Sequence, residues 1–508
     1  MAPGAGPAGS AGRETIGGTV GERFGLVIDG EVVAGDDGTY EVTNPARPAE
    51  VVLEAPSASL AQLDQAVAAA RRAARSWAAT DPSVRAERVV AAAQAAAAAV
   101  ERDGLARLLT REHGKVLFEA MFDAGTLAGM AGAFAPFTAQ AVAPRRIGEG
   151  HRRTEVEHVP HGVVAALLPF NWPVSVMGNK VLPALLTGNT VVAKAPPTCP
   201  GAVLATVAAM AAELPPGVLN IVNGPGASLG EALVAHRDVD MISFTGGVPT
   251  GRAVMASAAG STKPVVLELG GNDPAILAPD VEIDEALAAK LVEAAFVTSG
   301  QVCMAIKRLY VHRDRLGDLV EALNVRLAAE VVGDGLVEGV TMGPVHRPEA
   351  RDRVEGLIDE AASSGARVHR PATVRPEDAG SGGYLVSPAL VESPPPGSRI
   401  VREEQFAPAL PVLAYSDIEE AVAAANDTTF GLCASVWSND EELAASIAHR
   451  LEAGTVFVNS HGMSAMDFRA PMGGWKQSGF GVELGPEGMR AFTRPRTVLT
   501  SPGPTASS

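Results

Sequence analysis

The sequence predicts an α/β protein with two doubly wound parallel-sheet domains and a separate β-arm. The main observation is that, from residue 161 onward, short apolar runs alternate with helical patterns, as in 163–169, 174–186 and 189–193. Strands and helices that alternate at this spacing form parallel sheets. The chain has 508 residues, enough for several domains. Hydrophobic residues make up 47% and charged residues 19%, which excludes a disordered chain.

The first third of the chain is expected to contain short strands followed by helices. Apolar stretches within 24–53 predict strands. From Ser59 the apolar residues follow the helical period, and Ser59 with Gln62 predicts a capping box at the start of a helix. Further helices are predicted over 82–103 and 105–143.

Two later segments depart from this helical pattern. Residues 144–160 lose the helical period and carry both signs of charge, which predicts a hairpin arm. A second set of alternating strands and helices begins with the apolar sequence at 264–271 and ends at 454–460, which predicts the second α/β domain.

Composition excludes several classes of function. The net charge of −17 argues against binding to a nucleic acid. No apolar stretch approaches the ~20 residues of a membrane span, and the N-terminus lacks the pattern of a signal peptide. Three cysteines predict no disulfide framework and fit the reducing cytoplasm. No metal site is predicted.

Two glycine-rich turns are candidates for binding a nucleotide. Strand 219–222 precedes Gly224, Gly226 and Gly230, and a second turn lies at 243–247 before another helix. Glycines let the backbone approach a phosphate, and a helix N-terminus stabilises its charge. Each turn alone also fits an ordinary strand-to-helix connection. Lys194, at the end of strand 189–193, is either a ligand for ribose or phosphate or a solvated lysine.

Cys303 is the candidate nucleophile. It follows Ser299-Gly300-Gln301-Val302 at an expected loop-to-helix turn, where a helix N-terminus would lower its pKa from about 8.5. The alternative is a packed core cysteine, which is the interpretation for Cys199 and Cys433.

Glu268 and Asn171 are candidates for a base and an oxyanion donor. Glu268 ends an apolar strand, where burial is unfavourable for a charge and a raised pKa suits a general base. Asn171 lies in PFNWP and carries an amide that can donate to an oxyanion. The alternatives are a solvated strand-end glutamate and an ordinary turn asparagine.

Taken together, these motifs resemble the aldehyde dehydrogenase superfamily over nearly the whole chain. They occur in order from about residue 25 to 500. They are PFNWP (169–173), TGNTVVAK (187–194), LPPGVLNIVNG (214–224), SFTGG (243–247), LELGG (267–271), GQVC (300–303), EEQFAP (403–408), GTVFVN (454–459) and MGGWKQSGFG (472–481).

The resemblance implies oxidation of a small aldehyde to a carboxylic acid with NAD(P). Cys303 would attack the carbonyl carbon, and Asn171 with the Cys303 backbone N–H would hold the oxyanion. After the oxidation step, Glu268 would activate the water that hydrolyses the thioester. Lys180 matches a lysine that supports the same site.

The resemblance also assigns residues to the cofactor. NAD is the expected cofactor. NADP remains an open alternative because Pro197 replaces a glutamate that binds the adenosine 2′-hydroxyl in many relatives, and a carboxylate there would repel a 2′-phosphate. Gly247 likewise replaces a serine of the pyrophosphate site. The expected cofactor residues are Lys194, Thr198, Gly226, Gly246, Gly247, Leu269, Glu404, Phe406 and Phe170.

The expected substrate pocket is medium-sized and partly polar. Lys307 is interpreted as a surface charge, with contact to the pocket as the alternative. The residues expected to line the pocket are Trp172, Val176, Asn179, Val302, Met304 and His461.

The resemblance further implies a homodimer or homotetramer with a defined division of the chain. The expected parts are a flexible N-terminal arm (1–20), a cofactor domain (21–143 and 161–268), a catalytic domain (269–470), an oligomerisation arm (144–160 and 482–500) and a tail (501–508).

The sequence leaves three alternatives to an aldehyde dehydrogenase that hydrolyses its thioester. A CoA-acylating aldehyde dehydrogenase transfers the acyl group to coenzyme A, and such relatives often lack a glutamate at the position of Glu268. A non-catalytic member of the fold would not need Cys303, Glu268 and Asn171 together. A nucleotide-binding regulatory module would need neither a nucleophile nor a base.

Overall fold

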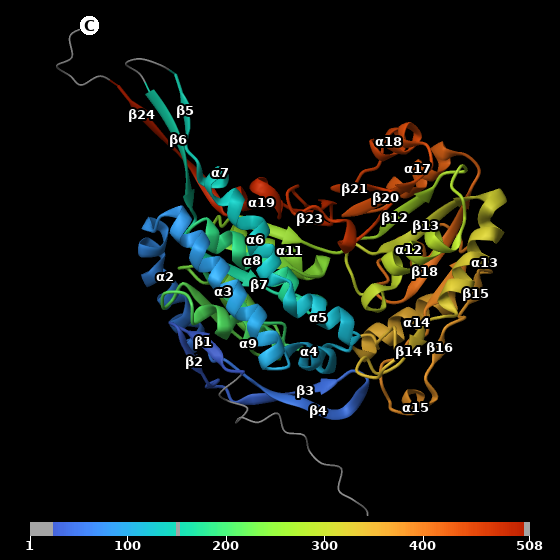
Figure 1. The fold of residues 1–508 in the computed structure, drawn as a ribbon, viewed down its shortest axis with the longest axis horizontal. Helices are drawn as coiled ribbons and strands as arrows, with labels where there is room; N and C mark the ends of the chain where they lie inside the picture. Colours follow the sequence, from blue (N-terminus) through green and yellow to red (C-terminus); the bar gives the residue numbers. More distant parts are fainter. Residues whose placement is uncertain (1–23, 149–152, 502–508) are drawn as a thin grey trace, which may run out of the picture.

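Two α/β lobes lie side by side, and a β-arm projects from the first of them (Figure 1). The computed structural model describes residues 24–148 and 153–501. The expected N-terminal arm 1–20 and tail residues 502–508 lie outside this part of the chain. Within the described ranges, none of the helices is long and apolar enough to cross a bilayer.

The first lobe is built on an eight-stranded sheet of order β2-β1-β9-β8-β7-β10-β11-β23. Its strands from β9 to β11 are parallel and largely buried, which explains their continuous apolar sequences. Residues 265–268, grouped above with the second set, form β11 of this first sheet because they pair with β10. The strands are β1 (Leu26–Ile28), β2 (Glu31–Val33), β7 (Val163–Leu167), β8 (Thr190–Lys194), β9 (Leu219–Val222), β10 (Met241–Thr245), β11 (Val265–Glu268) and β23 (Gly479–Phe480).

The helices of this lobe confirm one prediction and correct another. Ser59 Oγ accepts from the backbone N–H of Gln62, and the Gln62 side chain accepts from the N–H of Ser59, as the capping box requires. The helical range predicted over 105–143 is divided into α4, α5, α6, η1 and α7, and the first break follows Gly114, which adopts φ +102° at the end of α4. The helices are α2 (Leu60–Ala79), α3 (Pro82–Arg102), α4 (Leu105–His113), α5 (Leu117–Gly125), α6 (Leu127–Phe134), η1 (Ala135–Phe137), α7 (Thr138–Val142), α8 (Pro173–Leu186), α9 (Gly201–Ala211), α10 (Ser228–Ala235), α11 (Val248–Ala259) and α19 (Gly485–Ala491).

The second lobe repeats the architecture with a seven-stranded sheet of order β15-β17-β18-β13-β12-β20-β21. The strands are β12 (Asp273–Leu277), β13 (Ile306–His312), β15 (Arg367–His369), β17 (Ala389–Glu392), β18 (Ala409–Tyr415), β20 (Cys433–Trp437) and β21 (Thr455–Val458). The helices are α12 (Glu285–Phe296), η2 (Val297–Gly300), η3 (Arg313–Arg315), α13 (Leu316–Leu327), α14 (Pro348–Ser363), α15 (Pro376–Ala379), α16 (Arg399–Arg402), α17 (Ile418–Asn426), α18 (Glu441–Ala448) and η4 (Met463–Ala465). Short pairs join β14 (Val331–Val332) to β16 (Thr373–Val374) and β19 (Phe430–Gly431) to β22 (Trp475–Lys476).

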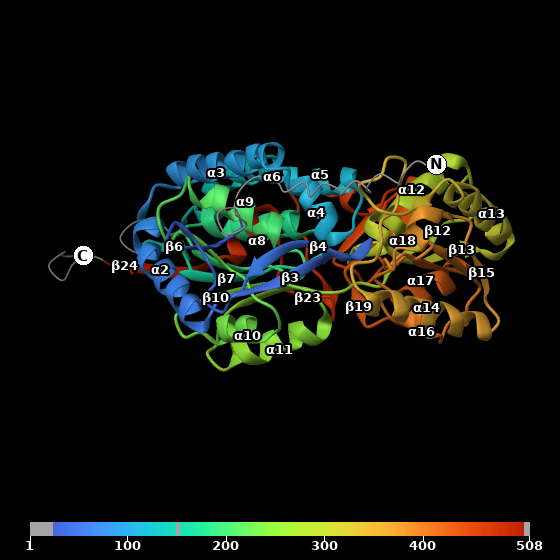
Figure 2. The ribbon, with the colours of Figure 1, turned by 90° about the horizontal axis from the view of Figure 1, so that it is seen from below.

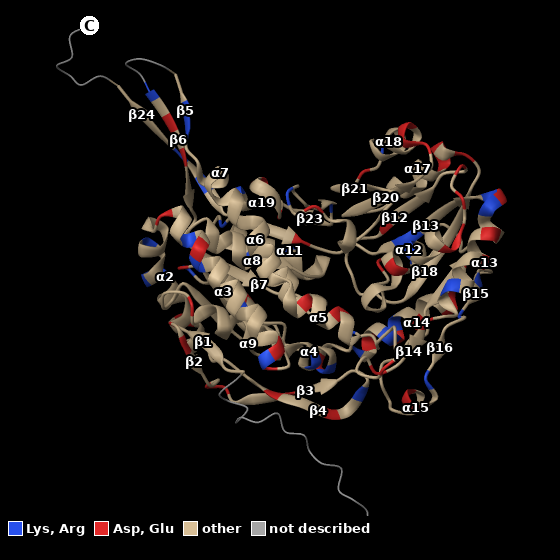
Figure 3. Ribbon diagram, in the orientation of Figure 1, with Lys and Arg blue, Asp and Glu red and all other residues tan. Residues whose placement is uncertain are grey.

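The arm expected from 144–160 together with a strand near 490–500 is a three-stranded sheet in the described residues. Strand β6 (Arg153–Pro160) pairs on one side with β5 (Arg145–Ile147) and on the other with β24 (Thr493–Thr500). Both signs of charge lie along the arm (Figure 3), as in the ion pair in which Arg496 Nε donates to Glu157 at 2.6 Å.

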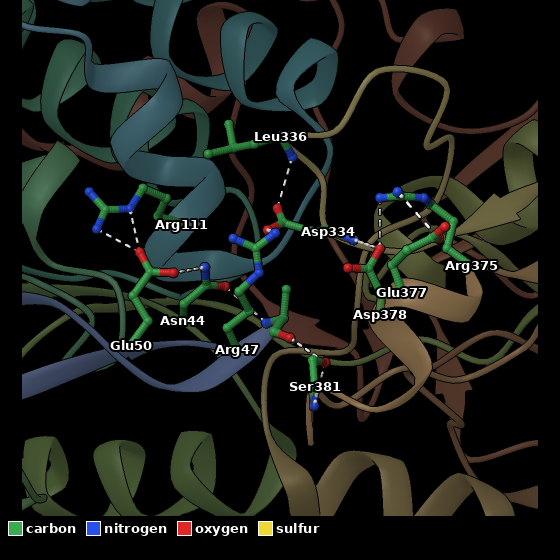
Figure 4. A network of polar contacts seen from close by, with 12 residues as sticks. Asn44, Arg47, Glu50, Arg111, Asp334, Leu336, Arg375, Glu377, Asp378 and Ser381 are labelled. Carbon is green, nitrogen blue, oxygen red and sulfur yellow. Dashed lines mark hydrogen bonds and ion pairs between the residues drawn. The ribbon is translucent and has the colours of Figure 1, made fainter. Parts of the chain in front are cut away.

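A hairpin from the first lobe binds the second lobe. It consists of β3 (Thr39–Asn44) and β4 (Arg47–Pro56), and it runs from one lobe to the other (Figure 2). Arg47 contacts Asp334 at 2.8 Å, and Ser381 donates to the carbonyl of Ala46 at 2.8 Å (Figure 4). These contacts help to fix the two lobes relative to each other.

Candidate active site

The loop before Cys303 has an unusual backbone. Thr298, Ser299 and Gly300 all adopt positive φ, at 53°, 56° and 71°. Such conformations are unfavourable for residues with side chains and persist only where neighbours hold them. Glu119 accepts from the Thr298 N–H at 2.6 Å, and Ser299 donates to the Gly343 carbonyl at 2.7 Å. The loop is therefore held from both lobes.

The surroundings of Cys303 differ from the prediction. Cys303 follows η2 and precedes β13, so the expected helix N-terminus is wrong, because the next element is a strand. Burial raises the pKa of its thiol to about 12, whereas the nearby Lys307 lowers that pKa. Cys199 and Cys433 are buried, as expected for core cysteines.

Lys307 is buried beneath the nucleophile, so its interpretation as a surface charge is wrong. The residue is 2% exposed because β13 is a central strand of the second sheet. Its ammonium group donates to the carbonyls of Val302 at 2.9 Å and Cys303 at 2.8 Å, and lies 3.5 Å from a carboxylate oxygen of Glu404.

Glu268 ends β11 with its carboxyl group buried. The residue is 6% exposed, and its Oε1 has no hydrogen-bond partner among the described residues. Burial raises the pKa of this carboxyl well above its usual value, the charge of Glu483 raises it further, and Lys180 opposes the shift. Lys180 donates to Glu483 at 2.6 Å. A carboxylate with a raised pKa is a stronger base toward water than an ordinary one.

Two glycines after Glu268 allow groups from the second lobe to approach. A Cβ atom on Gly270 would lie 2.2 Å from a carboxylate oxygen of Glu404, and one on Gly271 would lie 2.5 Å from the Cys303 carbonyl oxygen. The Gly271 N–H also donates to Glu404 at 3.0 Å. A side chain at Gly270 or Gly271 would therefore displace Glu404 or the backbone of Cys303.

Asn171 lies beside the same loop. Its amide nitrogen donates to the Gln301 carbonyl at 2.9 Å, which uses one of its two N–H groups. The neighbouring Trp172 is buried and has the Lys115 ammonium over its ring at 4.0 Å.

Most of the predicted substrate residues come together near Cys303. One apolar cluster contains Trp172, Val176, Val302, Met304 and the half-buried Cys303. His461 joins it through a contact of its Nε2 with the Met304 carbonyl at 2.9 Å. A cavity of about 580 Å³ is lined by Val302, Met304 and His461, among others.

Asn179 stands apart from this cluster. It and Val176 are the two residues of α8 that are not fully buried, so they share one face of that helix. The Asn179 carbonyl oxygen has no partner among the described residues. Neither the apolar cluster nor the 580 Å³ cavity includes Asn179.

A second cavity, of about 870 Å³, lies at the C-terminal ends of β7, β8 and β10. Three predicted cofactor residues line it, namely Lys194, Thr198 and Gly226. Lys194 is buried rather than solvated, and burial lowers its pKa to about 8. A Cβ atom on Gly226 would meet no atom within 4 Å, so it would project into open space. The cavity therefore fits a nucleotide.

The other predicted cofactor residues lie outside the lining of this cavity. Gly246 donates its N–H to the Glu268 carbonyl at 3.0 Å, and Gly247 begins the turn into α11. Leu269 packs in the core of the first lobe. Phe170 and Phe406 meet edge to face at 6.0 Å. Glu404 lies 3.5 Å from Lys307, which also donates to the Cys303 carbonyl, and Phe170 stacks on His346 of the cavity lining.

Comparisons with known proteins agree with this geometry. The sequence profile of the "Aldehyde dehydrogenase family" matches residues 32–498. The chain belongs to the aldehyde dehydrogenase family. It is 37% identical to the 3,6-anhydro-alpha-L-galactose dehydrogenase of Streptomyces coelicolor, over 91% of this chain and 93% of that protein. The activity of this aldehyde dehydrogenase is therefore oxidation of an aldehyde to an acid with NAD(P).

Solved structures of aldehyde dehydrogenases show the same fold. Betaine aldehyde dehydrogenase from Staphylococcus aureus, in complex with NAD⁺, is 30% identical with a TM-score of 0.89, over 95% of this chain and 96% of that chain. An NADP-dependent enzyme from E. coli is 31% identical with a TM-score of 0.88, over 94% and 98% of the two chains. These likenesses confirm the predicted two-domain α/β fold.

Several residues of this aldehyde dehydrogenase escaped the sequence analysis. Lys115 and Asp123 form a fully buried ion pair at 2.9 Å, and Asp123 also accepts from the Ser175 N–H at 2.8 Å. His346 lines the larger cavity and contacts Thr198. A lysine and an aspartate eight residues apart carry little local signal, and no motif includes His346. Among the described residues, no group of three or more His, Cys, Asp or Glu side chains is arranged to hold a metal.

Proposed function

We propose that Cys303 is the nucleophile, Glu268 the general base and Asn171 an oxyanion donor of this aldehyde dehydrogenase. The observation that carries the proposal is that Asn171 and Glu268, from the first lobe, lie beside the Cys303 loop of the second lobe. The buried Glu268 carboxyl lies near enough to raise the pKa of the Cys303 thiol, and Asn171 contacts the residue two positions before Cys303.

The first step is attack on the aldehyde carbonyl. The Cys303 thiol loses its proton to solvent water, a bond forms between its sulfur and the carbonyl carbon, and the carbonyl π bond breaks to leave a negatively charged oxygen. The amide of Asn171 and the backbone N–H of Cys303 stabilise that charge. The bound nicotinamide cofactor supplies the oxidising power that converts the adduct to a thioester.

The second step is hydrolysis of the thioester. Glu268 takes a proton from water, the water oxygen bonds to the acyl carbon, and the carbon–sulfur bond breaks to release the acid and Cys303. The charge of Glu483 beside Glu268 supports this role because it raises the proton affinity of the base. Lys180 limits that shift and holds Glu483 in place.

We propose that NAD is the preferred cofactor. Lys194, Thr198 and Gly226 line the larger cavity and would bind the adenosine side of NAD. The charged residues that line the cavity are two cations and three carboxylates, a balance that disfavours an additional phosphate. They are Lys194, Arg347, Glu41, Glu231 and Glu349.

The nicotinamide side of the cofactor would bind nearer to Cys303, on residues outside the larger cavity. Glu404 is proposed to accept from the ribose hydroxyls, and its carboxylate is held by the backbone N–H of Gly271 and the ammonium of Lys307. The remaining residues proposed for this side are Phe170, Gly246, Gly247, Leu269 and Phe406.

The proposed substrate is a small aldehyde without a carboxylate. The apolar residues Trp172, Val176, Val302 and Met304 favour an apolar body next to the reacting carbon. His461 adds a polar group that lines the cavity, and Asn179 is proposed for the pocket only because it shares a face of α8 with Val176.

We further propose that the arm joins copies of the chain into a homodimer or homotetramer in the cytoplasm. Strand β24 is an edge of the arm sheet, and its Leu499 is 74% exposed. An exposed apolar edge strand is stabilised by pairing with another chain. The cofactor and catalytic domains are proposed with the boundaries 21–143 with 161–268 and 269–470, and the arm consists of β5, β6 and β24 because α19 packs on the first lobe. The three free cysteines support a reducing compartment.

Initial rates test the proposed function. Short and long aliphatic, aromatic, amino- and semialdehydes are paired in turn with NAD and NADP, and the absorbance of the reduced cofactor is followed. We expect reduction of NAD with at least one class of aldehyde, and none by the Cys303→Ala variant. Equal turnover by that variant would contradict the assignment of the nucleophile.

A further inference from the structure

Thr198 and His346 both line the larger cavity and contact each other through their side chains. Within residues 190–200, Pro197 and Thr198 are the two that are not fully buried, and both line the cavity. The Thr198 hydroxyl oxygen lies 2.6 Å from Nε2 of His346. Thr198 belongs to the first lobe, whereas His346 lies between β14 and α14 of the second.

The partners of the His346 ring determine which of its nitrogens carries the proton. Nδ1 lies 3.0 Å from the carbonyl oxygen of His113. A carbonyl can only accept, so Nδ1 must be the donor. Burial lowers the pKa of His346 to about 4, so the ring is neutral at neutral pH and Nε2 has no proton. The Thr198 hydroxyl therefore donates its hydrogen to His346.

The His346 ring is held in this orientation. It stacks on Phe170 at 4.5 Å with an interplanar angle of 11°, and on His113 at 5.0 Å with an angle of 16°. Its backbone N–H donates to the side chain of Gln301 at 2.9 Å. A ring flip would put a carbon in place of each ring nitrogen, so the His113 carbonyl and the Thr198 hydroxyl would both lose their partner.

This arrangement leaves Thr198 with only lone pairs to offer a ligand. A ribose hydroxyl can donate to them, whereas an ionised phosphate ester has no hydrogen to give. We propose that His346 makes Thr198 an obligate hydrogen-bond acceptor and thereby selects a cofactor with a free ribose hydroxyl over one that is phosphorylated there. The inference rests on the proposed function, because it assumes that the adenosine side of the cofactor lies at Thr198.

Other charges at the cavity act in both directions. Lys194 and Arg347 attract a phosphate, and Glu41, Glu231 and Glu349 repel it. The attraction and the repulsion partly cancel, so the loss of one hydrogen bond should change the ratio of the NAD and NADP affinities measurably. The net free energy of one neutral hydrogen bond changes a dissociation constant by about two- to tenfold.

Titration calorimetry of the full-length enzyme with NAD and with NADP at pH 8 tests the proposal. We expect His346→Leu to reduce the preference for NAD over NADP by about three- to tenfold, because the Thr198 hydrogen becomes free to donate to a phosphate. Thr198→Val should weaken NAD by a similar factor and affect NADP less. In the Thr198→Val background, His346→Leu should change the ratio by less than about twofold, because it acts through Thr198.

The control is His113→Phe, which retains a stacking ring next to His346 and does not touch Thr198. It should leave the ratio of affinities unchanged. The proposal is overturned if His346→Leu weakens both cofactors equally, or if its effect on the ratio persists without the Thr198 hydroxyl. Should His346→Leu fail to fold, unchanged NAD affinity in Thr198→Val overturns the proposal by itself. If the wild type binds neither cofactor, the proposed function fails with it.

Discussion

The ammonium group of Lys307 lies 2.8 Å from the carbonyl oxygen of Cys303 and 3.5 Å from a carboxylate oxygen of Glu404. One buried cation thus connects the proposed nucleophile to a residue proposed for the cofactor. Since Lys307 sits on central strand β13, the second sheet itself positions the backbone at Cys303.

Alkylation of Cys303 by iodoacetamide should depend steeply on pH. Burial raises the pKa of the thiol to about 12, so the reactive thiolate increases about tenfold per pH unit below that value. We expect the rate in the free enzyme to rise through pH 10 without a plateau. Lys307→Met should slow the reaction at every pH because Lys307 lowers the Cys303 pKa, and Lys307→Arg should preserve more of the rate. A plateau below pH 8 would contradict this prediction.

Cys303→Ala should abolish aldehyde oxidation and leave the affinity for NAD within about twofold of the wild type. The larger cavity does not include Cys303, so the adenosine side of the cofactor should bind as before. Steady-state rates and calorimetry measure the two quantities. Cys199→Ala is the matched control and should retain turnover, since Cys199 is a buried core cysteine.

Glu268→Gln should slow deacylation by about 10²–10⁴-fold, so that an acyl-enzyme accumulates after one burst of cofactor reduction. In the wild type, deacylation should rise with pH, because the raised pKa keeps Glu268 protonated until the pH exceeds it. The variant should lose this dependence. Stopped-flow absorbance and mass spectrometry of the quenched enzyme provide the readouts; unchanged deacylation would show that another base acts.

Pro197→Glu should shift the preference further toward NAD. Pro197 lines the larger cavity, and a carboxylate there would repel a phosphate and accept from a ribose hydroxyl. Pro197→Gln is the matched control, with nearly the same size and no charge. If the ratio of the two affinities is the same in both variants, Pro197 does not face the ribose.

Leu499→Glu should weaken assembly of the chain. Leu499 is 74% exposed on edge strand β24, and a carboxylate is unfavourable in an interface that buries it. Light scattering after size exclusion should show a smaller species than the wild type. Leu60→Glu is the control, because Leu60 is 58% exposed on α2, away from the arm. An unchanged mass for Leu499→Glu would argue against an interface at this edge.

The local features of the fold were predictable because they depend on residues close together in the chain. The capping box of Ser59 and Gln62 needs only a three-residue spacing, and the strand Thr190–Lys194 is visible as an apolar run. The break of the predicted helix at Gly114 was missed, since a glycine inside a helical pattern is compatible with either outcome.

By itself, the sequence determined the α/β class, the arm, the family resemblance and the candidates Cys303, Glu268 and Asn171. Only the tertiary structure decided that Lys307 is buried, that a strand rather than a helix follows Cys303, and that His346 reaches Thr198 from the other lobe. The physical reason is that the spacing of apolar residues indicates only whether a segment is a helix or a strand and which of its faces is buried. Burial, pKa values and hydrogen-bond partners depend on residues far apart in the chain, which meet only when the two lobes pack together.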